Sequence, residues 1–145
     1  PLYSSAASDV YKRQTQQTAE WNAEKAQQIV QSVIDAGTPF NVIYAENDDM
    51  AKGAVAALDK ANISHGVGKD VIVMGFDCNK WALEELKAGN WNYDGQCNPF
   101  QASYIDEIIK KLENGETISE KTIIMDEKGF DATTITQEDV DNYGI

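Results

Sequence analysis

Histidine, cysteine and proline are scarce in this chain of 145 residues, which has one histidine, two cysteines and three prolines. A structural zinc site needs about four ligands of suitable type and spacing, so these residues do not supply one. Apolar runs are also short, at most a few residues long, and no segment is expected to insert into a membrane. Neither a nucleophile–base pair nor a metal set is apparent, so we expect neither an enzyme nor a cofactor.

Basic residues are outnumbered by acidic ones. The chain has 12 lysines and arginines against 24 aspartates and glutamates, a formal net charge of −12. This balance argues against binding to nucleic acid or to an anionic membrane surface. With 42% hydrophobic and 25% charged residues, the composition is that of a globular protein.

The segment Val42 to Ala54 combines a strand, a polar turn and the start of a helix. Residues 42–45 are rich in β-branched and aromatic side chains, which predicts a buried strand. Asp48 is predicted to be the N-cap of a helix over residues 48–61, whose apolar residues recur at helical spacing. A similar strand followed by polar residues occurs at Val71 to Asp77.

Along the whole chain, helix and strand patterns alternate. Helices are predicted at residues 23–36, 48–61, 81–88 and 100–114, strands at 42–45, 71–75, 93–96 and 121–125, and a last helical turn follows a capping box at Thr136–Asp139. This order predicts an α/β fold with a parallel sheet. Ligands of such sheets bind beyond the carboxyl ends of the strands, where Asn47 and Asp77 are expected. Each has an alternative role, Asn47 as a turn residue and Asp77 as a cap of the next turn.

The motifs Glu46 to Ala54 and Val73 to Asp77 closely resemble those of the sugar-binding periplasmic proteins of ABC importers, of the ribose- and galactose-binding type. The resemblance covers about residues 17–145, the C-terminal part of a chain roughly twice this long. It implies a three-layer parallel sheet of the type I periplasmic-binding-protein kind. Residues 17–98 would form part of the C-terminal lobe, residues 99–125 would belong to the N-terminal lobe, and residues 126–145 would be the return and tail. Residues 1–14 match nothing in that family and look like a non-native lead-in.

The resemblance also implies a function and a ligand site. The whole protein would bind a monosaccharide between two lobes and deliver it to a membrane permease. It would act in the periplasm, or as a lipid-anchored protein outside a bacterial cell, with its export signal missing from this chain. Trp21 and Gln96 fall where the family has ligand contacts, and Phe76 is a further candidate. Their alternatives are a hydrophobic staple for Trp21 and a core position for Phe76.

Two other classes of protein share parts of this pattern. A receiver-type phosphoacceptor also places paired acids after one strand and an aspartate after another, to hold a divalent ion. Such a protein would need a hydroxyl residue and a lysine at later strand ends, where this chain has Gln96 and Met125. A transcription regulator of the lactose-repressor type has the same effector fold, so it is the alternative function. A disulfide between Cys78 and Cys97 would be possible in an exported protein, with free thiols as the alternative.

Overall fold

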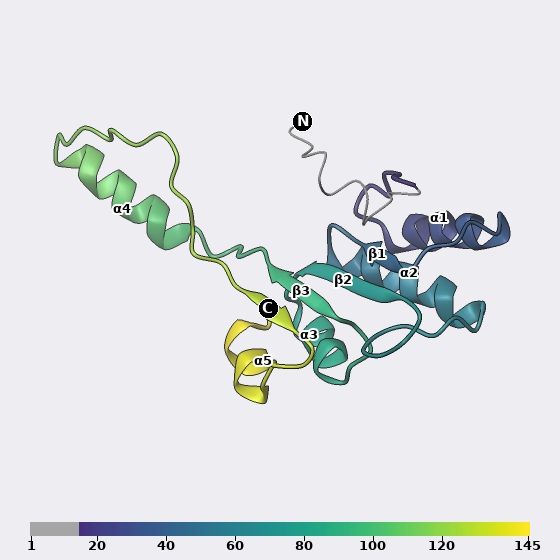
Figure 1. Ribbon diagram of the computed structural model, residues 1–145. Helices are drawn as coiled ribbons and strands as arrows, with labels where there is room; N and C mark the ends of the chain where they lie inside the picture. Colours follow the sequence, from purple (N-terminus) through teal and green to yellow (C-terminus); the bar gives the residue numbers. More distant parts are fainter. Residues whose placement is uncertain (1–14) are drawn as a thin grey trace, which may run out of the picture.

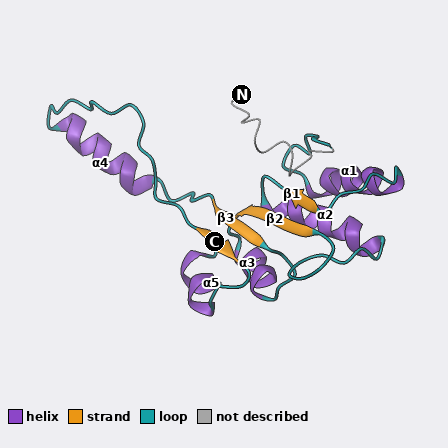
Figure 2. Cartoon of the chain, in the orientation of Figure 1, coloured by secondary structure: helices purple, strands orange, loops and turns teal. Residues whose placement is uncertain are grey.

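The computed structural model describes residues 15–145, and the predicted lead-in at residues 1–14 lies outside them. The elements in chain order are α1 (Ala23–Asp35), β1 (Val42–Tyr44), α2 (Asp48–Lys60), β2 (Ile72–Asp77), α3 (Lys80–Lys87), β3 (Tyr93–Gln96), α4 (Ala102–Glu113), β4 (Gly129–Asp131) and α5 (Gln137–Tyr143) (Figure 1). The α/β class is confirmed, and the predicted helices and the first three predicted strands lie within a few residues of their observed bounds (Figure 2).

The sheet has the strand order β1-β2-β3-β4. β1, β2 and β3 are parallel, as predicted. β4 is antiparallel to β3, pairing Tyr93 with Asp131 and Gly95 with Gly129. The predicted strand at residues 121–125 is wrong, because that segment is a loop whose Ile124 is exposed. No described strand lies beside it, and the short segment Gly129–Asp131 provides the fourth strand instead.

One face of the sheet carries the helices. Val73 and Gly75 of β2 are buried on this face, and the core there joins α2, α3 and α5 through Leu58, Leu83 and Val140. Side chains of the opposite face are more open, including Ile72 of β2 together with Val42 and Tyr44 of β1. The second helical layer expected of a three-layer fold is therefore not formed by the described residues.

The prediction that residues 42–45 form a buried strand is wrong for two of these positions. Tyr44 is 60% exposed and Val42 is 39% exposed. β1 is an edge strand of this sheet, and its alternate side chains project from the open face because successive residues of a strand point to opposite sides. Ile43, beside Val73, lies on the covered face, and Ala45, just after the strand, is buried in the same core.

Helix α1 packs along α2, and at Gly53 the two backbones approach closely. A Cβ atom at Gly53 would lie 2.0 Å from the carbonyl oxygen of Ala23 and 2.7 Å from its carbonyl carbon. Both are backbone atoms, so a side-chain rotation cannot relieve the clash. Glycine in the middle of a helix costs stability, and close helix contact is the physical reason for it here.

Gly53→Ala is therefore expected to destabilise the fold by about 1–3 kcal/mol, the usual range for overpacking. Alanine's better helix propensity, about 1 kcal/mol, offsets only part of the clash. Urea unfolding followed by circular dichroism measures the change. Lys60→Ala, at the exposed end of the same helix, is the control and should leave stability nearly unchanged. Equal stability of Gly53→Ala and the wild type would show that α1 and α2 are not packed as described.

Helix α4 extends away from the sheet, followed by a long loop (Figure 1). None of its residues is buried, although its apolar side chains follow a helical period. Two adjacent chain segments join this region to β3 and β4, and Gln96 N donates to Lys128 O across them at 2.8 Å.

Both cysteines are free thiols, Cys78 buried and Cys97 exposed, so the possible disulfide does not form.

Candidate functional site

The carboxyl ends of β1, β2 and β3 form one rim of the sheet, and three of the predicted ligand residues lie on it. Asp77 and Gln96 are direct neighbours in the register of β2 and β3. Asn47 follows the end of β1 and opens α2. All three side chains are partly exposed. The fold thus brings together an ionisable carboxyl group and two amides, as the sequence predicted for Asn47 and Asp77.

Asn47 is the N-cap of α2, which corrects the prediction that Asp48 has this role. The Asn47 side-chain oxygen accepts a hydrogen bond from Met50 N at 2.9 Å. Asp48 points inward and is completely buried, and its Oδ2 accepts from Asn79 N at 2.8 Å. Both residue types cap helices well. Asp48 bonds to Asn79, which is distant in sequence, and this leaves Asn47 as the cap of α2. Asn47 therefore has its amide nitrogen available to donate to a ligand.

The turn after β2 has an unusual backbone. Asp77 and Cys78 have φ angles of 119° and 61°, a region that residues other than glycine rarely adopt. Contacts from distant segments hold this turn, since Ile145 N donates to Cys78 O and Asp48 accepts from Asn79. Strained residues of this kind persist only where their surroundings fix them, and they concentrate at functional sites. Asp77 is thus presented at the rim in a fixed position.

Gln96 binds the segment that returns to β4. Its side-chain oxygen accepts from Lys128 N at 3.2 Å, and Asn98 N donates to the Glu127 side chain nearby at 2.7 Å. The amide nitrogen of Gln96 can donate to a ligand while the oxygen holds the returning chain. One side chain thus links the rim to the connection toward α4, a role that its place in the sequence does not indicate.

Phe76 lies on the open face of the sheet and packs on Tyr44. Their ring centroids are 5.2 Å apart, with planes tilted by 56°. The Phe76 ring also lies against Gly95, where a Cβ atom would be 2.6 Å from it. Tyr44 is an exposed aromatic next to the rim that was not predicted as a site residue. Side chains of residues 42–45 alternate between the two faces of the sheet, and this alternation is the signal that could have placed Tyr44 on the open face.

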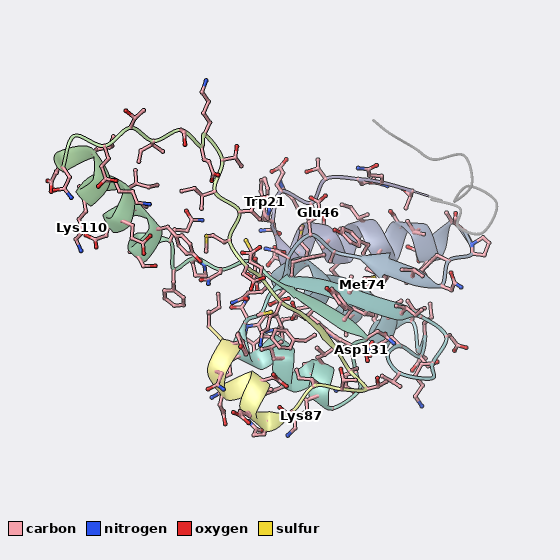
Figure 3. The ribbon with its side chains drawn as sticks, turned by 60° about the vertical axis from the view of Figure 1, so that its left-hand side comes forward. Trp21, Glu46, Met74, Lys87, Lys110 and Asp131 are labelled. Atoms are coloured by element: carbon pink, nitrogen blue, oxygen red, sulfur yellow. The ribbon has the colours of Figure 1, made fainter. Side chains whose placement is uncertain are left out.

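Trp21 lies in a tight turn just before α1. Asn22 N donates to Ala19 O across this turn, and Glu20 and Trp21 have φ angles of 53° and 54°. The Trp21 side chain is 71% exposed, so it does not act as a hydrophobic staple. In the view of Figure 3, Trp21 and Glu46 are labelled close to one another near the middle of the molecule, and Glu46 directly precedes the rim residue Asn47.

The rim combines hydrogen-bond donors with an anionic acceptor. Asn47 and Gln96 offer amide N–H groups, and ionised Asp77 accepts. Burial raises the pKa of Asp77, and the charge of Asp49 raises it further. Among residues 15–145, no group of three or more acidic, histidine or cysteine side chains is placed to hold a metal ion. Such a rim suits a neutral ligand with several hydroxyl groups.

Residues 5–117 match the model of a known family, the periplasmic binding protein domain. The chain belongs to this family. No helix of the described part of this periplasmic binding protein domain is long and apolar enough to cross a membrane.

Relatives of this domain include proteins named for sugar import. The chain is 32% identical over 128 residues to the fructose import binding protein of Bifidobacterium longum, covering 87% of this chain and 37% of that protein. It is also similar to an ABC transporter periplasmic solute-binding protein of Actinobacillus succinogenes with bound D-allose, at 30% identity and a TM-score of 0.70 over 88% of this chain and 42% of that one. The crystal structure of a galactofuranose-binding protein has the same fold, with a TM-score of 0.79 at 23% identity over 91% of this chain and 45% of that one.

This periplasmic binding protein domain thus spans less than half the length of these relatives. Those relatives are import and solute-binding proteins, which favours the importer hypothesis over a regulator of the lactose-repressor type.

Proposed function

We propose that this chain is part of a sugar-binding protein that captures a monosaccharide and delivers it to an ABC importer. The observation that carries the proposal is the juxtaposition of Asp77 and Gln96 at one rim, in register, with Asn47 at the end of the next strand. A sugar presents neighbouring hydroxyls along its ring edge, and planar amide and carboxylate groups contact such pairs. Exposed aromatics such as Trp21 suit the C–H faces of the ring.

A second lobe is part of this proposal. Helix α4 and the segment after it expose apolar side chains, with Ile105, Ile109 and Leu112 about half exposed. Such faces mark a missing partner. We propose that residues 99–125 pack in an N-terminal lobe, that residues 17–98 belong to the C-terminal lobe, and that residues 126–145 return to it. The sugar would then lie between the lobes and favour their closed arrangement, because only that arrangement contacts it from both sides.

The proposed partners follow from delivery to an importer. The closed protein would dock on a membrane permease and release the sugar there, as a carrier that does no chemistry on it. It would act in the periplasm or at the outer surface of the membrane as a lipid-anchored protein. Nucleic acid is not a proposed partner, since the net charge of −12 opposes it.

Thermal unfolding of a two-lobe protein tests the ligand class. Residues 15–145 would be joined to the N-terminal part of the Bifidobacterium longum fructose import binding protein, which would supply the proposed second lobe. One pentose or hexose among a panel of neutral monosaccharides is expected to stabilise the fusion protein. At a hundredfold excess over Kd the stabilisation is about 2.7 kcal/mol, because the ligand binds only the folded state.

Nucleotides, and Mg²⁺ with a phosphodonor, are the negative controls and should give no shift. A fusion protein carrying both Asp77→Ala and Gln96→Ala should fold but lose the response to the sugar. If a folded fusion protein responded to no pentose or hexose, or if the doubly substituted protein responded equally, the proposed site would be wrong.

A further inference from the structure

Two buried carboxyl groups meet beneath the rim. Asp48, at the start of α2, and Asp94, in β3, are both completely buried. They meet at Gly75 of β2, which pairs with Asp94 and where a Cβ atom would lie 2.6 Å from Asp48 Oδ1, so the two side chains lie side by side. No lysine, arginine or histidine of the described chain forms an ion pair with either of them. Two carboxylates in contact without a cation repel one another strongly in a region that excludes water.

The hydrogen-bond partners identify where a proton would lie. Asp48 Oδ2 accepts from the backbone and side-chain nitrogens of Asn79 at 2.8 and 3.1 Å. Asp94 Oδ1 accepts from the Cys78 thiol at 3.8 Å. The remaining oxygens, Asp48 Oδ1 and Asp94 Oδ2, are buried and have no donor among the described residues. A proton shared between these two oxygens would satisfy both of them.

We propose that Asp48 and Asp94 share one proton at neutral pH, with Asp94 as the donor, and that this protonated pair holds the turn that presents Asp77. Asp48 contacts the turn through Asn79, and Asp94 contacts it through Cys78. The strained residues are Asp77, the last residue of β2, and Cys78, which makes the contact with Asp94. The proposal concerns the fold of this turn and holds whether or not the rim binds a sugar.

The surroundings of the pair favour the retained proton. Burial raises the pKa of Asp94 to about 8, and the charge of Asp48 is the next cause. Burial also raises the pKa of Asp48, while the bonds from Asn79 lower it. The other titratable groups that face the pair are Asp77 and the Cys78 thiol, with Asp49 acting on Asp77. All of them are acids, so none supplies a compensating positive charge.

The sign of the pH dependence follows from the raised pKa of Asp94. Its contribution to stability is fully present below the ordinary aspartate value of 3.8 and is lost as the pH rises through about 8. The folding equilibrium constant of the 145-residue chain is therefore expected to fall about tenfold or more between about pH 6 and about pH 9.

The matched experiment compares urea unfolding of the wild type, Asp94→Asn and Asp49→Asn over this pH range. An asparagine at position 94 donates to Asp48 without titrating, so Asp94→Asn should lose most of the pH dependence. Asp49→Asn removes an exposed acid from α2, the helix that contains Asp48, and should keep the pH dependence. Equal pH dependence in the wild type and Asp94→Asn would overturn the proposal.

Two measurements do not depend on the variant being stable. Carbon NMR of the wild type labelled at its aspartate carboxyl carbons should show one carboxyl group still protonated at pH 7. In a Cys97→Ser background, alkylation of the buried Cys78 should be at least tenfold faster at pH 9 than at pH 7 after correction for the intrinsic ionisation of a free thiol, because the turn loosens. Complete titration of every aspartate below about pH 5, or Cys78 protection that is unchanged at pH 9, would refute the shared proton.

Discussion

Replacing Asp77 with alanine is expected to weaken monosaccharide binding by the two-lobe fusion protein about ten- to a hundredfold. Asp77 is the charged member of the three rim residues and, when ionised, accepts hydrogen bonds from two hydroxyls. Hydrogen bonds to charged groups contribute about 1.5–3 kcal/mol, and every 1.4 kcal/mol is about tenfold in affinity. Isothermal titration calorimetry with the sugar identified by thermal unfolding measures the loss.

Two comparisons separate a lost contact from a damaged fold. Asp77→Asn keeps the shape of the side chain and removes its charge, so its affinity should fall between that of the wild type and that of Asp77→Ala. Asp70→Ala removes an exposed carboxylate just before β2, at the opposite end of the strand that leads to Asp77. It should bind like the wild type. If Asp77→Ala bound as tightly as Asp70→Ala, the sugar would not contact Asp77.

The 145-residue chain by itself should bind hydrophobic dyes, associate in solution and have no measurable affinity for that sugar. Helix α4 buries none of its residues, and Ile123 and Ile124 in the loop after it are also exposed. Each large apolar side chain left in water forgoes roughly 1.5–3 kcal/mol of burial. A single rim also contacts only one side of a sugar and cannot exclude water from it.

Analytical ultracentrifugation and dye fluorescence measure association and apolar exposure. A variant with Ile105, Ile109 and Leu112 all replaced by lysine should associate less and bind less dye, since these side chains lie on the exposed helix. The matched control, Glu107→Lys on the same helix, changes the charge without removing apolar surface and should associate like the wild type. A stable monomer of the unaltered chain that bound the sugar tightly would mean that the site is complete without a second lobe.

Several features of the fold could be predicted from residues that lie close together in the sequence. The strand at residues 93–96 was predicted with its observed bounds. The capping box at Thr136 was also predicted, and Asp139 reaches back to Thr136 N at 2.9 Å as the motif requires. These features depend on residues within about one turn of each other, so the sequence contains what decides them.

Features that depend on distant residues were not predictable in this way. Asn47 and Asp48 are equally suitable caps of α2 from sequence. Asp48 instead points into the core, where its carboxylate accepts a hydrogen bond from Asn79 and lies beside Asp94. The exposure of Tyr44 depends on which face of the sheet the helices cover. β4 was missed because Gly129–Asp131 is short and contains a glycine, and it becomes a strand only by pairing with β3. Ile123 and Ile124 suggested a strand, but an apolar pair without a neighbouring strand stays a loop.

The pairing of β3 with β4 has a topological consequence. These antiparallel neighbours form a β-hairpin whose loop is residues 97–128, a whole helix with its connections. Each doubling of a loop adds only about 0.6 kcal/mol to the entropic cost of closing it, so this loop costs roughly 2 kcal/mol more than a tight turn. Contacts so far apart in the chain form late in folding. The sheet can therefore assemble around β1, β2 and β3 first, with β4 and α5 completing it only after the inserted helix has been synthesised.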